Sequence, residues 1–175
     1  LLKNESLLPV DTQKFKKILV TGPNANNQSI MGDWVFEQPE KNVSTILKGI
    51  KEEASGTQIN YVDVGWNMRA LDSAKIEKAI QTAKSSDLAI VIVGEDSFRQ
   101  HWKEKTCGEN RDRMDITLWG KQDYLVESIY KTGVPTIVIL VNGRPLATGW
   151  VAENIPAVIE AWEPGSMGGK AIAEI

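Results

Sequence analysis

Two uninterrupted apolar runs constrain the fold of this chain more than any other feature. Residues 88–93 and 136–141 read Leu-Ala-Ile-Val-Ile-Val and Thr-Ile-Val-Ile-Leu-Val. A strand carries such a pattern when both of its faces are covered, as happens at the centre of a parallel sheet. Gly94 ends the first run and Asn142-Gly143 ends the second. The two runs therefore predict central strands of a sheet with helices on both faces.

Further strands and helices alternate around these two runs. Three more strands are predicted, at residues 16–21, 58–64 and 156–162. Helices are predicted at residues 43–54, from Ser73 as N-cap to about residue 86, and at residues 122–131. Alternation of this kind is typical of the α/β class, in which crossover connections are right-handed. We expect a three-layer sandwich around a mostly parallel sheet.

The bulk composition excludes several classes of protein. The 175 residues are 42% hydrophobic and 25% charged, which is ordinary for one globular domain. A formal net charge of -3 gives no basic surface for nucleic acid. No apolar run approaches the roughly 18 residues of a membrane span. The single cysteine, Cys107, excludes an internal disulfide.

Both ends of the sequence resemble cut ends. Leu1 is not an initiator methionine, and the first residues do not have the pattern of a signal peptide. Residues 169–175 read as an amphipathic helix that stops early. We expect the chain to be a piece of a longer protein.

Residues 95–118 form the longest segment without sustained periodicity, and they are rich in charge. Irregular connections of this length are uncommon inside a compact domain and are usually functional or disordered. The segment follows a central strand, so it lies at the carboxyl edge of the predicted sheet, where ligands bind in open α/β sheets. Any chemistry is expected there.

Glu109 is one of several acidic residues in this segment, with Glu95, Asp96, Glu104, Asp112 and Asp115. Gly108 gives the backbone freedom to project the carboxylate of Glu109, and Arg111 and Arg113 lie close in sequence. A general acid must hold a proton near neutral pH, whereas arginines favour the charged carboxylate, so a second wall of the site must oppose them. The alternative is a solvated surface loop in which Asp112 and Arg113 make structural hydrogen bonds.

Other kinds of site have little support. His101 is the only histidine, and no Gly-x-Ser-x-Gly nucleophile elbow is present. No cysteine and histidine cluster has the spacing of metal ligands. The loop at residues 22–26 resembles neither a Walker loop nor a dinucleotide fingerprint. We therefore expect no metal and no cofactor.

Six tryptophans are many for a chain of this length. Trp119, Trp150 and Trp162 lie near the ends of predicted elements, where packing explains them. Trp34 and Trp102 lie in predicted loops, and an exposed indole there suits the apolar C–H faces of a sugar ring. For Trp34, ligand contact and packing both remain open.

Motifs along the whole chain resemble those of glycoside hydrolase family 3, the β-glucosidase family. They are the leading segment 1–10, the strand and loop 17–25, Gly32-Asp-Trp34, the helix 43–50, Gly94-Glu95, the Gly-Glu-Asn-Arg-Asp-Arg of residues 108–113, Asn142-Gly-Arg-Pro-Leu146 and residues 160–173. They occur in the order of the family. Asn110 and Trp119-Gly120 depart from its usual pattern.

The resemblance implies a fold and an activity. Residues 1–175 would be one C-terminal domain with about six strands, preceded in the whole enzyme by a TIM-like barrel that supplies an aspartate nucleophile. The enzyme would be a retaining exo-β-glycosidase, like a β-glucosidase, acting on terminal β-linked sugars of a β-glycoside or oligosaccharide. The isolated domain is expected to be inactive, and the resemblance favours a periplasmic or secreted location.

The resemblance also implies roles for individual residues. It places the acid/base residue at Glu109, with Glu95 and Glu104 as runners-up. Trp34 would contribute to the aglycone subsite, and Asp112 and Arg113 would order the loop.

Two other functions remain open from the sequence. One is a non-catalytic carbohydrate-binding or interaction module on the same fold. The other is a nucleotide-binding, flavodoxin-like domain, which only the predicted sheet supports.

Overall fold

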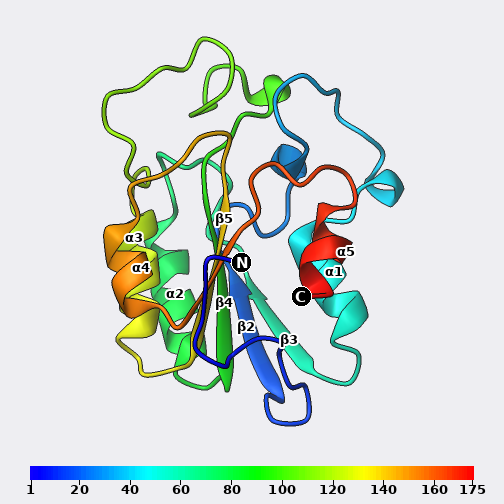
Figure 1. The fold of residues 1–175 in the computed structure, drawn as a ribbon, viewed down its shortest axis with the longest axis vertical. Helices are drawn as coiled ribbons and strands as arrows, with labels where there is room; N and C mark the ends of the chain where they lie inside the picture. The colour runs from blue at the N-terminus through cyan, green and yellow to red at the C-terminus, as the bar shows by residue number, and fades with distance from the viewer.

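A computed structural model describes all residues from 1 to 175 and contains one six-stranded sheet (Figure 1). The strands are β1 (Lys3–Asn4), β2 (Lys17–Thr21), β3 (Gln58–Val62), β4 (Leu88–Gly94), β5 (Thr136–Val141) and β6 (Ala157–Glu160). Their order in the sheet is β1-β6-β5-β4-β2-β3. All neighbours are parallel except β1, which runs antiparallel to β6 at one edge. The predicted mostly parallel sheet of about six strands is confirmed.

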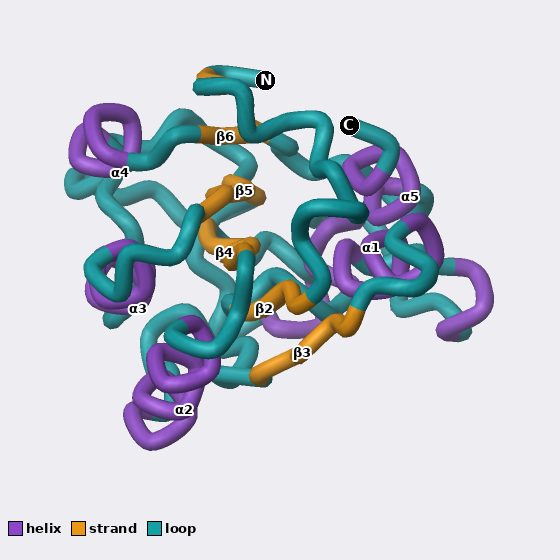
Figure 2. Tube along the Cα trace, turned by 90° about the horizontal axis from the view of Figure 1, so that it is seen from below, coloured by secondary structure: helices purple, strands orange, loops and turns teal.

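Helices cover both faces of the sheet, which gives the three predicted layers (Figure 2). They are α1 (Ile46–Glu53) and α5 (Gly168–Ala173) on one face, and α2 (Ser73–Ala83), α3 (Gln122–Tyr130) and α4 (Gly149–Asn154) on the other. Short 3-10 turns are η1 (Gln28–Met31), η2 (Glu40–Asn42) and η3 (Arg99–His101). None of the helices has both the length and the apolar character needed to cross a membrane.

Strands β4 and β5 are buried at every position, which explains their uninterrupted apolar sequence. Alternate side chains of β4 enter different cores: Ala89, Val91 and Val93 pack with α2 and α3, whereas Ile90 and Ile92 pack with α1. A fully buried side chain of this size stabilises the fold by roughly 1.5–3 kcal/mol. The sheet is thus the common wall of two hydrophobic cores.

Helices α1 and α5 approach each other closely through two glycines. A Cβ atom on Gly49 would lie 2.1 Å from the Gly169 carbonyl oxygen, and one on Gly169 would lie 2.0 Å from that of Thr45. No other residue fits either position without moving a helix. The glycines therefore explain why residues 169–173 lie against α1.

Two predictions about α2 were wrong, and two short elements were not predicted. Ser73 is not the N-cap of α2; Asp72 is, and its carboxylate accepts the amides of Ala74 and Lys75. The same helix ends at Ala83 and gives way to turns before residue 86. Strand β1 and helix α4 were not foreseen, because both are short and α4 has no side-chain cap.

An apolar hollow of about 410 Å³ lies at the amino ends of the strands, between α1, α5 and the segment before β2. Its lining includes Val10, Ile18, Ile50 and Ile175. The candidate residues of the long loop take no part in it. The site described next lies at the opposite, carboxyl edge of the sheet.

Candidate active site

The loops that follow β2, β4, β5 and β6 gather at the carboxyl edge, at the top of Figure 1. In the loop after β4, Asp96 donates its amide to Thr106 Oγ1 at 2.9 Å, and its carbonyl accepts the amides of Thr106 and Cys107 at 2.7 and 3.2 Å. These bonds close residues 96–107 into a folded lobe. The segment 95–118 is therefore irregular but hydrogen-bonded.

Glu109 stands on this loop with its side chain 41% exposed. Its backbone amide donates to Asp33 Oδ2 at 2.6 Å, and Arg99 Nη1 donates to its Oε2 at 3.0 Å. Its neighbours Gly108 and Asn110 both have positive φ, at 85° and 59°. The backbone turns sharply on either side of Glu109, which presents a tethered carboxylate to solvent.

Asp33, from the loop after β2, lies at the centre of these contacts. Its side chain is only 10% exposed and accepts Lys105 Nζ at 2.9 Å and Arg99 Nη1 at 3.2 Å. Lys105 is fully buried. Burial would raise the pKa of Asp33, but the bonds from Lys105, the Glu109 amide and Arg99 together hold it below its ordinary value. Asp33 is thus ionised and joins two loops.

Exposed indoles flank the same arginine. The guanidinium of Arg99 lies 3.7 Å from the ring centre of Trp34 and 5.2 Å from that of Trp102. Trp34 is 72% exposed and Trp102 is 41% exposed. Both indoles lie in loops, as the sequence indicated, and Trp34 is not a core residue. Their open surfaces, beside the arginine that binds Glu109, can stack on a sugar ring.

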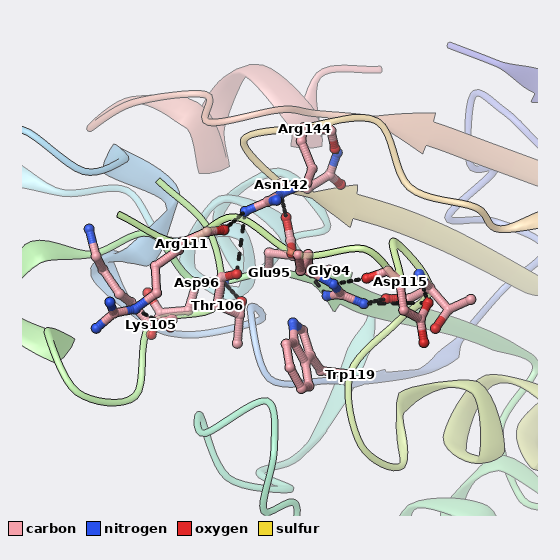
Figure 3. Close-up of polar contacts among 12 residues, drawn as sticks. Gly94, Glu95, Asp96, Lys105, Thr106, Arg111, Asp115, Trp119, Asn142 and Arg144 are labelled. Atoms are coloured by element: carbon pink, nitrogen blue, oxygen red, sulfur yellow. Dashed lines mark hydrogen bonds and ion pairs between the residues drawn. The ribbon is translucent and has the colours of Figure 1, made fainter. Parts of the chain in front are cut away.

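Glu95 occupies a different environment from Glu109, because its side chain is fully buried. Oε1 accepts Arg113 Nη1 and Oε2 accepts Arg144 Nε, each at 3.1 Å, and Figure 3 shows Glu95 between Arg144 and the Asp115 segment. Burial raises the pKa of Glu95, and the two arginines oppose that rise. Glu95 therefore ties the long loop to the loop after β5.

The remaining sequence candidates lie around this framework. Glu104 is half-buried, and its carbonyl accepts Arg69, while its side chain makes no hydrogen bond or ion pair. Asp112 is exposed and its side chain also makes none. Arg113 binds Glu95 and the carbonyls of Asp115 and Thr117. The structure thus links Trp34 and Glu109 through Arg99, whereas Glu95 binds a different pair of arginines, Arg113 and Arg144.

His101 forms a pair with Asp96, whose Oδ2 lies 2.6 Å from Nδ1, and it stacks on Trp66 at 4.0 Å. No serine or cysteine hydroxyl or thiol bonds to its ring. The pair anchors η3 within the lobe. No group of three or more His, Cys, Asp and Glu side chains is arranged to hold a metal ion.

The family model described as "Glycosyl hydrolase family 3 C-terminal domain" matches residues 1–175. The chain belongs to glycosyl hydrolase family 3. The resemblance drawn from its motifs is confirmed. The candidate site is therefore part of the C-terminal domain of a β-glycosidase family.

Curated relatives of this family 3 domain carry β-glycosidase names. A "Beta-xylosidase" of Formosa agariphila is 38% identical over the whole chain, which covers 24% of that protein. A "Periplasmic beta-glucosidase" of Salmonella typhimurium is 30% identical, again over the whole chain and 25% of the relative. The chain thus spans about a quarter of the length of the curated relatives that it matches.

Solved family 3 structures share the fold. A "GH3 exo-beta-xylosidase (XlnD) in complex with xylobiose aziridine activity based probe" superposes with a TM-score of 0.83 and 28% identity over 99% of the chain and 21% of that structure. A β-glucosidase from Listeria innocua in complex with gluconolactone gives 0.82 and 27% over 99% of the chain and 22% of its own. Both are longer proteins that contain a domain like this one.

Several residues of the candidate site were not predicted from the sequence. Asp33 lay inside a motif noted only for Trp34, and Arg144 lay inside Asn142-Gly-Arg-Pro. Position within a recognised motif could have signalled both. Lys105 and Arg99 gave no such signal, because only folding brings them to Asp33.

Proposed function

We propose that this domain forms one wall of the active site of a retaining exo-β-glycosidase and that Glu109 is the acid/base residue. The observation that carries the proposal is the environment of its carboxylate. Glu109 is exposed at the carboxyl edge of the sheet, held through both its amide and its carboxylate, and linked through Arg99 to two exposed indoles. A proton donor needs access to substrate together with a fixed position.

The other two glutamates fit that role less well. Glu95 has no exposed side-chain surface, and both of its oxygens are engaged by arginines, so no substrate oxygen reaches it. The side chain of Glu104 is half-buried and has no partner to orient it. Access and orientation therefore favour Glu109 among the three.

The proposed reaction has two steps. Glu109 first gives its proton to the leaving glycosidic oxygen while an aspartate of the preceding barrel, as the family resemblance implies, attacks the anomeric carbon. The ionised Glu109 then takes a proton from the water that releases the glycosyl-enzyme. In retaining enzymes the two carboxyl groups lie about 5–5.5 Å apart. The domain alone is expected to have no hydrolytic activity, because it lacks the nucleophile.

Arg99 orients the carboxylate of Glu109. Its Nη1 donates to Glu109 Oε2 at 3.0 Å, whereas Oε1 accepts no hydrogen bond within the domain. A group that first gives and then takes a proton at one position must keep its orientation through both steps.

Trp34 suits the aglycone side of the same site. Its indole is largely exposed next to Arg99, which binds Glu109 directly. A sugar that leaves with the proton from Glu109 lies within reach of this surface. Stacking of its C–H face on Trp34 would orient the leaving oxygen.

Kinetics of the full-length enzyme test the proposal through the leaving group. We compare Glu109→Ala with Glu104→Ala, a matched glutamate of the same loop, on dinitrophenyl glycosides and on unactivated disaccharides of glucose and xylose. Glu109→Ala is expected to lower kcat/KM for disaccharides by about 10²–10⁴-fold and to affect the activated aryl glycosides far less. Glu104→Ala should change kcat/KM little on either type of substrate. Equal losses on both substrates with Glu109→Ala would contradict the role.

Exposed indoles alone would also suit a non-catalytic carbohydrate-binding module. That function predicts an upstream barrel without an acidic residue opposite Glu109, and oligosaccharide binding without turnover. Calorimetry with oligosaccharides, together with the kinetics above, separates the two functions.

A further inference from the structure

We propose that Asp33 is the positioning residue for Glu109, a role that rests on the acid/base function proposed above. Asp33 lies in the loop after β2, and Glu109 lies 76 positions later in the loop after β4. The two loops meet at the carboxyl edge through the carboxylate of Asp33. Nothing in the proposed chemistry requires Asp33 to touch the substrate.

Both carboxylate oxygens of Asp33 accept hydrogen bonds, and each of them links Asp33 to Glu109. Oδ2 accepts the Glu109 amide at 2.6 Å, so it fixes the main chain of the acid/base residue. Oδ1 accepts Arg99 Nη1 at 3.2 Å, and the same nitrogen donates to Glu109 Oε2 at 3.0 Å. Asp33 thus holds the backbone of Glu109 directly and its carboxylate through Arg99.

Lys105 anchors Asp33 from inside the loop. Its ammonium group is fully buried and donates to Asp33 Oδ2 at 2.9 Å, its only carboxylate partner. A buried ammonium is stable only with such a partner, so the pair cannot separate without exposing a charge to an apolar interior. Lys105 therefore holds the carboxylate of Asp33 in the position from which it binds Glu109.

The backbone around Asp33 is confined on both sides. A Cβ atom on Gly108 would lie 2.5 Å from Asp33 Oδ2, so only glycine lets the Glu109 loop come this close. On the other side, Gly32 has φ of 90°, and a Cβ there would lie 2.7 Å from a carboxylate oxygen of Glu163. The contact at Gly108 thus places the main chain before Glu109 directly against the Asp33 carboxylate.

Loss of the Asp33 carboxylate should therefore act on turnover. The Glu109 amide and Arg99 both lose an acceptor, and the carboxylate of Glu109 gains freedom to move. A displacement of about 1 Å can cost general acid catalysis roughly 100-fold. Because Asp33 itself does not bind sugar in this proposal, kcat should fall for disaccharides while KM changes little.

Asp33 also neutralises Lys105, so a purely structural role must be separated from positioning. The full-length Asp33→Ala variant leaves a buried unpaired ammonium, and its stability should fall. The double variant Asp33→Ala/Lys105→Met removes that charge with a side chain of similar length. Asp33→Asn keeps an oxygen that can accept the Glu109 amide. Glu37→Gln, on the exposed part of the same loop, removes one negative charge that has no partner.

The experiment measures Tm and the kcat and KM of each variant on disaccharides and dinitrophenyl glycosides. We expect the double variant to regain most of the Tm lost by Asp33→Ala and yet to keep a loss in kcat of about 10–100-fold on disaccharides only. The loss in kcat on disaccharides should be smaller for Asp33→Asn than for Asp33→Ala. Glu37→Gln should match the wild type in both Tm and kcat. This pattern would separate placement of Glu109 from neutralisation of Lys105.

Two results would overturn the inference. One is a double variant with wild-type kcat on disaccharides, which would reduce Asp33 to a partner of Lys105. The other is an equal loss on both substrate types. Glu109→Ala measured in parallel keeps the two proposals distinct. If it lacks leaving-group dependence, the acid/base function fails and this inference falls with it; if it shows that dependence and the Asp33 variants do not, only this inference fails.

Discussion

Glu95 Oε1 lies 3.1 Å from Arg113 Nη1, with the side chain of Glu95 fully buried and that of Arg113 only 10% exposed. The other carboxylate oxygen of Glu95 binds Arg144. A buried carboxylate with two guanidinium partners crosslinks the segments 95–118 and 142–148. The loop that carries Glu109 is therefore held at its base as well as at Asp33.

This crosslink predicts a large stability effect. Glu95→Gln leaves two partly buried arginines without their counter-charge, and removal of one member of a buried pair costs roughly 3–5 kcal/mol. Glu127→Gln is the control, because it breaks an exposed pair with Lys131 that is worth about 0.3–0.5 kcal/mol. Urea unfolding followed by tryptophan fluorescence gives both values. Similar losses in the two variants would show that the Glu95 crosslink is not structural.

Gly94, the last residue of β4, provides a second stability test. Its φ is 144°, and an added Cβ would lie 1.9 Å from the Val141 carbonyl oxygen. Gly94→Ala should combine backbone strain of about 1–3 kcal/mol with overpacking of about 1–3 kcal/mol. Gly133→Ala, at φ of 84° with open space around it, should cost only about 1–2 kcal/mol. Equal losses of stability in the two variants would show that β5 can shift at the end of β4 to make room for the added methyl group.

Cys107 should be chemically inert while the protein is folded. Burial, with the nearby charge of Glu95, raises the pKa of its thiol to about 12, from an ordinary 9.0. Three pKa units lower the thiolate fraction by roughly 1,000-fold, so iodoacetamide at pH 8 should alkylate the native protein far more slowly than the urea-unfolded chain. Comparable rates, measured by mass spectrometry, would mean that the loop opens readily.

Asp33 gives the stability of the protein a defined pH dependence. Its pKa is lower in the folded state than its ordinary value of 3.8, so the unfolded state binds the proton more readily. The contribution of Asp33 is therefore present above pH 3.8 and is lost as the pH falls through the folded-state pKa. The stability difference between wild type and Asp33→Asn should be large at pH 6 and smaller at pH 2–3. A difference that does not change with pH would contradict the ion pair with Lys105.

The central strands of the sheet were predicted well because burial on both faces requires an uninterrupted run of apolar residues. Strand β5 matches its predicted range of 136–141, and β4 differs by one residue, since both are apolar throughout. Strand β1 pairs only two residues, Lys3 and Asn4, at an edge, so it has no such pattern. The N-cap of α2 was assigned one residue late because Asp72 and Ser73 are both good caps, and only the carboxylate reaches the free amides.

The candidate site was predicted in part. The charged, aperiodic segment 95–118 indicated where chemistry was to be expected, and the family resemblance placed the acid/base residue at Glu109 within it, on a turn that begins at Gly108. The sequence did not predict the partners of Glu109: Asp33 lies 76 positions away, and Arg99, ten positions away in the same loop, is placed against Glu109 by an irregular backbone that has no sequence pattern. Contacts between loops depend on the whole fold, whereas strands depend on their own residues.

Azide rescue tests the acid/base role of Glu109 most directly. In the full-length Glu109→Ala variant, azide can occupy the space of the lost carboxylate and attack the glycosyl-enzyme without a general base. With a dinitrophenyl β-glycoside, we predict faster turnover in azide and a β-glycosyl azide as product, identified by nuclear magnetic resonance. Turnover that azide leaves unchanged, or an α-configured product, would contradict Glu109 as the acid/base residue of a retaining enzyme.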